Sequence, residues 1–291
     1  MEATIDGVRV FYDPVGGEAN YPLILLHGGP GLDHTYLQPW YDVLTDAFRL
    51  LYVDLRGHGR SERVDPSTVS LRAFADDVSR LAAALRLERY AVLGHSYGAF
   101  VALAHAIEHG GASHYVLSSG TASFSKTAPE IEENLARFEP VELREQVTQS
   151  WALEPTVKTA EEFDRLWRMQ LPFHFARVDG EAYRRFTDPT SGTLQQMVYA
   201  PEMLAYFAAN GYSIEYEERL STITRPTLII TGAYDRTCTP RASQDLHAGI
   251  PGSELAIIPD AGHMTFAEQP DLYFAAIRDF FARPPVAGKA Q

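Results

Sequence analysis

The stretch from Tyr90 to His109 constrains the fold more than any other part of this chain. Residues 90–93 are mostly apolar and predict a short buried strand, and residues 99–109 predict an apolar helix. The motif G-H-S-Y-G joins them, with Ser96 at its centre. Its two glycines lack the Cβ that would clash where the strand and the helix cross. We therefore predict a sharp, strained turn that presents the Ser96 hydroxyl at the helix N-terminus, where the helix dipole favours negative charge.

Short apolar runs alternate with helical patterns along most of the chain. Strands are predicted at residues 4–12, with a hairpin turn at Asp6 and Gly7, and at 21–27, 48–53, 115–117, 227–231 and 255–258. Helices are predicted at 70–87, 241–248 and 268–281. Parallel neighbours in a sheet need a crossover connection, which is usually a helix. The alternation therefore predicts the α/β class, with a mostly parallel central sheet flanked by helices.

The segment from about residue 124 to 216 breaks this alternation. It is amphipathic, rich in glutamate and interrupted by prolines, and it holds no apolar run of the kind that forms a strand. We predict an inserted helical cap at 124–216 and a core made of residues 1–123 and 217–291. The cap glutamates are expected mainly on a solvated face. Its large aromatic side chains are expected mainly inside the cap, namely Trp151, Trp167, Phe173, Phe175 and Phe207.

Composition argues against several classes of partner. The 291 residues carry 38 acidic and 25 basic side chains, a formal net charge of -13, so binding to a phosphate backbone is not expected. The single cysteine, Cys238, cannot form an internal disulfide, which fits a reducing compartment. The first residues show no signal-peptide pattern, and no apolar run reaches the roughly 18 residues that span a bilayer. We expect a cytoplasmic protein without a nucleic-acid or membrane partner, and composition leaves its oligomeric state open.

Three polar residues lie a few residues after predicted strands, at the edge where α/β sheets bind their ligands: Ser96, Asp235 and His263. A serine hydroxyl is a weak nucleophile at neutral pH, so it needs an imidazole base and a carboxylate that fixes the tautomer of that base. We predict that Ser96 is the nucleophile, His263 the base and Asp235 the acid. Asp54 and Asp260 also follow strands, but we expect them to hold loops.

An oxyanion hole needs backbone N–H groups aimed at the developing charge, and one such donor is worth roughly 3 kcal/mol or more of barrier. The amide of Tyr97 is one candidate, because it stands at the helix N-terminus. The second is expected from the loop H-G-G-P-G at residues 27–31, which follows a strand. Pro30 has no N–H to offer. Gly29 is the predicted donor, and Gly28 is the second candidate in this loop.

These motifs resemble those of the α/β-hydrolase superfamily and, more narrowly, of the proline iminopeptidases, in which H-G-G-P-G follows the third strand. The resemblance covers nearly the whole chain and is weakest in the cap. It implies an α/β-hydrolase fold and removal of an N-terminal residue, often proline, from small peptides, with no metal or cofactor. It also implies the same triad of Ser96, Asp235 and His263, with Gly29 and Tyr97 as oxyanion donors.

Two features depart from the iminopeptidase pattern. Enzymes of that group usually bind the substrate ammonium with cap glutamates and often with a glutamate directly after the triad aspartate. Glu202 stands where a cap glutamate is expected, but Arg236 follows Asp235, and its charge would repel an ammonium. The second departure is D-L-R-G-H-G at residues 54–59, which resembles general esterases and lactonases. Glu202, Arg236 and Gly28 are the candidate substrate contacts.

Taken together, these features predict a serine hydrolase that forms an acyl-enzyme with a small-molecule or short-peptide substrate beneath a helical cap. The first choice is an iminopeptidase-like aminopeptidase or amidase. The alternative is a carboxylic ester or lactone hydrolase of the same fold. A non-catalytic ligand receptor is a third interpretation, and the complete triad argues against it because a receptor needs neither a base nor an orienting acid.

Overall fold

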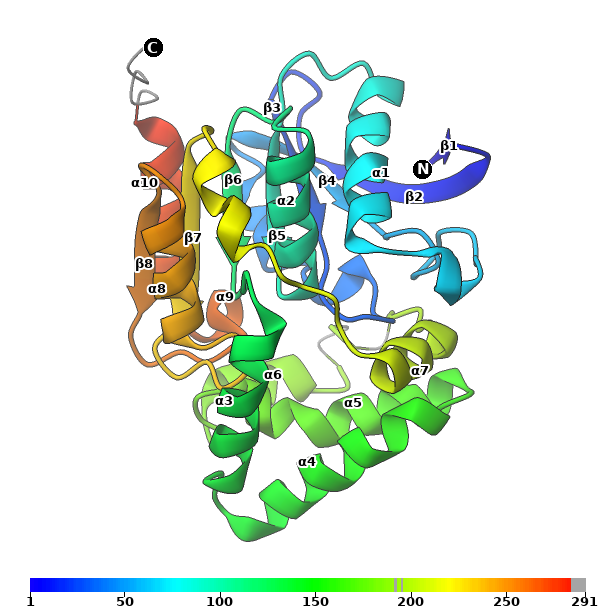
Figure 1. Ribbon diagram of the computed structural model, residues 1–291, viewed down its shortest axis with the longest axis vertical. Coiled ribbons are helices and arrows are strands. Elements are labelled where there is room, and N and C mark those ends of the chain that lie inside the picture. The colour runs from blue at the N-terminus through cyan, green and yellow to red at the C-terminus, as the bar shows by residue number, and fades with distance from the viewer. Residues whose placement is uncertain (191–192, 195, 284–291) are drawn as a thin grey trace.

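The computed structural model describes residues 1–190, 193, 194 and 196–283, and its centre is one sheet of eight strands (Figure 1). The strand order is β1-β2-β4-β3-β5-β6-β7-β8. β1 pairs with β2, and β2 with β4, in antiparallel fashion, and the remaining pairs are parallel. The strands are β1 (Glu2–Ile5), β2 (Val8–Val15), β3 (Tyr21–Leu26), β4 (Phe48–Val53), β5 (Ala91–His95), β6 (Tyr115–Ser118), β7 (Thr227–Gly232) and β8 (Glu254–Ile258). The predicted α/β class with a mostly parallel sheet is confirmed.

Both faces of the sheet are covered, as the apolar strands require. Along β3, Ile24 and Leu26 pack into one core, and Leu23 and Leu25 pack into the other. The first core is covered by α1 (Leu71–Ala84), α2 (Tyr97–Glu108) and α8 (Pro240–Gly249). The second is covered by the 3-10 turn η2 (Tyr41–Leu44), α9 (Thr265–Glu268) and α10 (Pro270–Ala282).

The segment assigned to the cap is helical in the part that the structure describes. Figure 1 shows its helices grouped at one end of the sheet. Hydrogen bonds tie it to the core: the amide of Ala200 donates to the carbonyl of Gly31, and the amide of His263 donates to the carbonyl of His174, both over 2.8 Å. The cap therefore lies against the loops that follow β3 and β8. Its helices are α3 (Phe124–Ala136), α4 (Val141–Leu153), α5 (Ala160–His174), α6 (Glu181–Thr187) and α7 (Pro201–Asn210).

Two predicted elements near the ends of the chain agree with the structure and differ from it only in their bounds. The hairpin turn expected at Asp6 and Gly7 joins β1 to β2, and both residues have the positive φ that such a turn uses. The helix expected at 268–281 is α10, which begins two residues later at Pro270, and the short α9 precedes it. Proline has no N–H to continue a helix but fits its first turn. Among the described residues, no helix is long and apolar enough to cross a membrane.

Candidate active site

Ser96 lies at the sharp turn between β5 and α2. Its φ of 55° and ψ of -119° fall in a region that residues other than glycine rarely occupy. A Cβ on Gly94 would lie 2.0 Å from the carbonyl oxygen of Gly98, and one on Gly98 would lie 2.1 Å from that of Leu26. Both motif glycines are therefore required by the close approach of backbone to backbone. The turn places Ser96 in the wall of a cavity beneath the cap.

Asp235 and His263 come from the loops after β7 and β8 and meet in the buried interior. His263 Nδ1 lies 2.9 Å from Asp235 Oδ2. The hydroxyl of Thr237 also lies 2.9 Å from this Nδ1 atom, and it donates to Asp235 Oδ1. Oδ1 accepts two further hydrogen bonds, from the amides of Thr237 and Cys238. The carboxylate is thus held at both oxygens and cannot turn away from the imidazole.

The electrostatics of this pair favour an oriented base. Burial acts to raise the pKa of Asp235, but the charge and hydrogen bond of His263 and the hydrogen bonds of Thr237 lower it below its ordinary value overall. An ionised Asp235 accepts the proton on Nδ1 of His263, which leaves Nε2 as the free acceptor. His263 and Ser96 line the same cavity. The arrangement can therefore take a proton from a group at that cavity wall.

The loop after β3 holds the Gly28–Gly29 peptide at a fixed angle. The Gly28 amide donates to the Tyr36 hydroxyl over 2.7 Å, so it is engaged inside the protein. The amide of Leu55 donates to Nε2 of His27, which puts the proton of a neutral His27 ring on Nδ1, from where it donates to the Gly28 carbonyl over 2.6 Å. In a trans peptide the C=O and N–H bonds point in opposite directions. The Gly29 N–H therefore points away from His27, and it is better suited than Gly28 to serve as an oxyanion donor.

The amide of Tyr97, the other predicted donor, is the first N–H of α2. The first amides of a helix have no partner within that helix and favour a negative charge. Ser96 directly precedes this amide, and both Ser96 and Gly29 line the cavity. The Tyr97 amide is therefore adjacent to the predicted nucleophile, and Gly29 lines the same cavity as Ser96.

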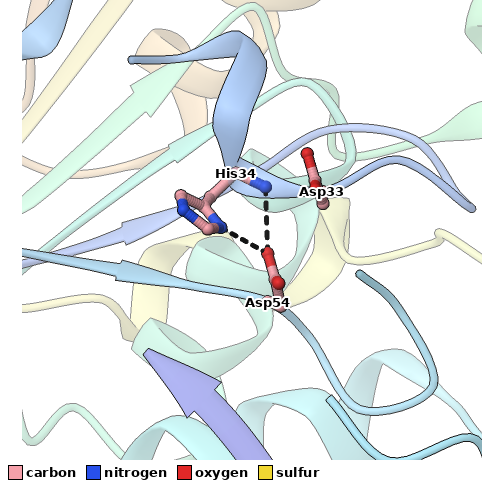
Figure 2. A group of neighbouring side chains, drawn as sticks. All are labelled: Asp33, His34 and Asp54. Carbon is pink, nitrogen blue, oxygen red and sulfur yellow. Dashed lines mark hydrogen bonds and ion pairs between the residues drawn. The ribbon is translucent and has the colours of Figure 1, made fainter. Parts of the chain in front are cut away.

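A buried cluster of Asp33, His34 and Asp54 lies in the loops that follow β3 and β4 (Figure 2). Its atoms are close enough to suggest a metal site, but their oxygens already accept hydrogen bonds. Asp54 Oδ1 accepts from the amide of His34 and lies 2.6 Å from the Nδ1 atom of that ring. Asp54 Oδ2 accepts from the amide of Arg60, whose guanidinium donates to Asp33 Oδ2. A guanidinium already supplies the positive charge, so the donor set does not fit a metal ion, and the cluster braces the loops after β3 and β4.

The cavity above Ser96 has a volume of about 420 Å³ and a mostly apolar wall. The core contributes the loop of Gly28 and Gly29 and the residues Ser96 and His263. Cap aromatics contribute much of the rest, among them Trp151, Trp167 and Phe207, which were expected mainly inside the cap. Phe173 and Phe175 are fully buried, as expected. A volume of this size is typical of small-molecule sites.

Glu154 is the acidic residue among the described residues that line the cavity, and the sequence analysis missed it. It begins the 3-10 turn η4 (Glu154–Thr156), where Gln170 Nε2 donates to its Oε1 over 2.6 Å. Burial raises the pKa of Glu154 to about 7. In the sequence it is one of many cap glutamates, and nothing in its neighbours marks it as inward-facing. Its position depends on how η4 packs against α7, a long-range contact.

Glu202 and Arg236, two of the predicted substrate contacts, are not among the described residues that line the cavity. Glu202, in the first turn of α7, is about 40% exposed and lies 3.1 Å from the guanidinium of Arg63. Arg236 points into the cap, where its Nη1 donates to the carbonyl of Phe175 over 2.7 Å and its guanidinium lies over the ring of Phe138. Each of the two side chains thus has a partner away from the cavity lining, and its contact with substrate stays a prediction.

The sequence model of the alpha/beta hydrolase fold matches residues 21–270 of the chain. The chain belongs to the alpha/beta hydrolase family. It is an enzyme of the hydrolase class, and its resemblance to proline iminopeptidases is confirmed by similarity over nearly its whole length.

A curated proline iminopeptidase from Lactobacillus acidophilus is 27% identical over 284 residues, which cover 94% of each chain. Two solved structures share the fold. A proline iminopeptidase of Mycobacterium smegmatis has a TM-score of 0.74 at 21% identity and covers 97% of both chains. A thermophilic esterase of Thermogutta terrifontis has a TM-score of 0.69 at 24% identity, again covering 97% of both. The fold is thus shared by a peptidase and an esterase.

Proposed function

We propose that this hydrolase acts through Ser96 as nucleophile, His263 as general base and Asp235 as orienting acid. The hydrogen bond between His263 and Asp235, with Ser96 on a strained turn in the same cavity, is the observation that carries the proposal. A strained nucleophile turn is retained where it serves a function, because such a backbone conformation is unfavourable by roughly 1–3 kcal/mol. The amides of Gly29 and Tyr97 complete the machinery as the oxyanion hole.

The reaction proceeds in two halves. In the first, Ser96 Oγ attacks the substrate carbonyl carbon while Nε2 of His263 takes its proton, and the Gly29 and Tyr97 amides bind the oxyanion. The tetrahedral intermediate collapses when His263 returns that proton to the leaving group, which departs as an amine or alcohol and leaves an acyl-enzyme. In the second half, water attacks the acyl carbon, with His263 again as base. Ser96 is regenerated and a carboxylic acid is released.

We further propose that the substrate carries a free amino terminus, as in a proline iminopeptidase. Similarity to curated enzymes of that name over 94% of the chain supports this proposal. Glu154 supports it as well, because a half-buried carboxylate in a mostly apolar wall is suited to hold an ammonium. The apolar side chains around it suit the hydrocarbon part of an N-terminal residue. Glu154, from η4, takes the role that the sequence assigned to Glu202.

The experiment compares three substrates of matched size: a prolyl arylamide, its N-acetylated analogue and a short acyl ester. We expect kcat/KM for a prolyl arylamide to exceed that for its N-acetylated analogue by 100-fold or more, because acetylation removes the charge that Glu154 binds. Ser96→Ala should abolish turnover of both, and a fluorophosphonate should label the wild type and not this variant. Equal rates for the free and the acetylated arylamide would contradict recognition of the amine.

The matched pair Glu154→Gln and Glu145→Gln separates this site from a general loss of charge. Glu145 is an exposed glutamate on α4 of the same cap. We expect Glu154→Gln to raise KM for the free arylamide by at least tenfold and to leave the acetylated analogue unchanged. Glu145→Gln should alter neither. Parallel changes in both Glu variants would argue against a specific ammonium site.

Hydrolysis of carboxylic esters or lactones is the second candidate. The observation that favours it is the aromatic wall of the cavity, in which Glu154 alone among the described lining residues carries a carboxylate. A short acyl ester is the third substrate of the panel. An ester preference of several decades without any arylamide turnover would establish this alternative. A protein that neither turns over a substrate nor reacts with the fluorophosphonate would be a receptor instead.

A further inference from the structure

Tyr36 and His95 line the same cavity as Ser96 and link the loops of the candidate site through a continuous chain of hydrogen bonds. The amide of Gly28 lies 2.7 Å from the Tyr36 hydroxyl, which lies 2.7 Å from His95 Nδ1. At the other end of the ring, His95 Nε2 lies 3.0 Å from the carbonyl oxygen of His263. Both side chains are buried, with about 1% of their surface exposed. These hydrogen bonds thus connect the loop of Gly28 and Gly29, which holds a predicted oxyanion donor, to the loop of the predicted base, His263.

The direction of every hydrogen bond in this chain is determined. A carbonyl only accepts, so His95 Nε2 donates to His263. A neutral ring has one proton, so His95 Nδ1 accepts from the Tyr36 hydroxyl, and that hydroxyl oxygen accepts from the Gly28 amide. Burial lowers the pKa of His95 to about 3, so the ring is neutral across the pH range of ordinary enzymes. With a neutral His95 ring, no other arrangement of protons satisfies all three contacts.

We propose that Tyr36 and His95 are positioning residues that fix the oxyanion loop, the Ser96 turn and the His263 loop relative to one another. The proposal rests on the serine-hydrolase function proposed above. His95 directly precedes Ser96, so the ring anchors the turn from below while it holds the backbone of the base. The Tyr36 hydroxyl bonds to this ring and to the Gly28 amide, so it holds the loop of Gly28 and Gly29 in the same way.

The geometry at Gly28 shows how closely this loop is held. A Cβ on Gly28 would lie 2.8 Å from the Tyr36 hydroxyl and 3.1 Å from Ser96 Cβ. The loop therefore touches the tyrosine on one side and the nucleophile on the other. A misplacement of about 1 Å in such a site lowers the rate by about 100-fold. Without the tyrosine hydroxyl, the buried Gly28 amide would turn toward another acceptor and move the Gly29 N–H with it.

The experiment measures the rate at which a fluorophosphonate labels Ser96, together with kcat and KM for the best substrate of the panel. We expect Tyr36→Phe to slow labelling 10- to 100-fold and to lower kcat by a similar factor with KM within twofold of wild type. Two His95 variants test the two ends of this hydrogen-bond chain separately. An asparagine amide reaches the position of Nδ1, so His95→Asn keeps the bond to Tyr36, whereas His95→Gln reaches the position of Nε2 and keeps the bond to His263.

Tyr41→Phe is the matched control, because it also removes a buried tyrosine hydroxyl. The Tyr41 hydroxyl lies 2.7 Å from that of Tyr273, which keeps a second partner in Ser118. We expect a similar loss of stability in Tyr36→Phe and Tyr41→Phe, measured by urea unfolding, but slow labelling only in Tyr36→Phe. Should Tyr36→Phe not fold, the two His95 variants are compared with Tyr41→Phe in the same way.

The outcomes separate the two proposals. Labelling of Tyr36→Phe and both His95 variants within twofold of Tyr41→Phe would overturn the positioning role and leave the serine hydrolase intact. A wild-type protein that is not labelled at Ser96 would overturn the serine-hydrolase function and the positioning role with it. The double variant Tyr36→Phe/His95→Gln gives a further check: residues that act in one chain are non-additive, so it should label about as slowly as the slower single variant.

Discussion

Arg236 Nη1 donates to the carbonyl oxygen of Phe175 over 2.7 Å and so ties the residue after Asp235 to the cap. The same stretch of cap, at the end of α5, accepts the amide of His263 at the carbonyl of His174. The cap is therefore bonded to the loops of both the predicted acid and the predicted base.

Glu268 joins the same two regions from the core side. Its Oε1 accepts the amide of Ala176 over 2.7 Å, and its Oε2 accepts the amide of Gly262 over 2.6 Å. Gly262 directly precedes His263. The cap segment 173–176 is therefore held by Arg236 and Glu268 together, and a change in either residue should affect the base as well as the cap.

Arg236→Glu tests this attachment. A sequence argument expects the new carboxylate to attract an ammonium and to improve free-amine substrates. The structure leads to the opposite expectation, because a carboxylate cannot donate to the Phe175 carbonyl. We expect a loss of about 1–3 kcal/mol in the free energy of urea unfolding and no gain in kcat/KM for the prolyl arylamide. Arg165→Glu, a charge reversal at an exposed position of α5, should change neither quantity. Improved amine turnover would show that position 236 faces the substrate.

The raised pKa of Glu268 predicts a pH-dependent stability. Burial raises this pKa to about 7, whereas an unfolded glutamate titrates near about 4.3. The folded state binds more protons than the unfolded state between these values, so stability falls as pH rises through this window. We expect the contribution of Glu268 to be complete below about pH 4 and lost above about pH 7. Urea unfolding at pH 5 and pH 8 should therefore show a smaller pH-dependent loss in Glu268→Gln than in wild type. An unchanged difference would mean that other groups cause it.

The ionisation of Glu154 should set the pH dependence of substrate choice. Burial raises its pKa to about 7, so the carboxylate that attracts an ammonium forms as pH rises through that value. We expect the ratio of kcat/KM for a free-amine arylamide to that for a neutral ester to rise several-fold from pH 6 to pH 8. A group that acts on both substrates alike cancels in the ratio. In Glu154→Gln this rise should disappear.

Asp235→Asn tests the role of the orienting acid. An asparagine amide facing Nδ1 favours the tautomer with its proton on Nε2, which cannot accept a proton from serine. We expect kcat to fall by about 10³–10⁴ with KM nearly unchanged, by analogy with the same change in a serine protease triad. Cys238 offers a control, because its amide, not its thiol, bonds to Asp235. Cys238→Ser should retain most activity, and equal losses in both variants would point to a packing defect.

Much of this protein follows from its sequence. A buried strand is recognised in the sequence as a short run of apolar residues. The α/β class and the strand positions could therefore be predicted from residues near one another in the chain. The turn at Ser96 was predictable for the same reason, because the clash that requires Gly94 and Gly98 arises within a few residues of the motif or on the adjacent strand β3. The triad order placed Asp235 and His263 after their strands, and the structure brings these two side chains into contact.

Tertiary structure alone decided what surrounds the nucleophile. Glu202 and Arg236 looked like substrate contacts in the sequence, yet each pairs elsewhere, while Glu154 lies in the cavity. Which side of a cap helix faces inward depends on its packing against elements far away in the chain, and a polar side chain carries no local mark of that direction. The same holds for the chain of Tyr36 and His95, whose partners are distant in sequence. Strands and motifs are fixed by local backbone geometry, whereas the pocket is fixed by long-range packing.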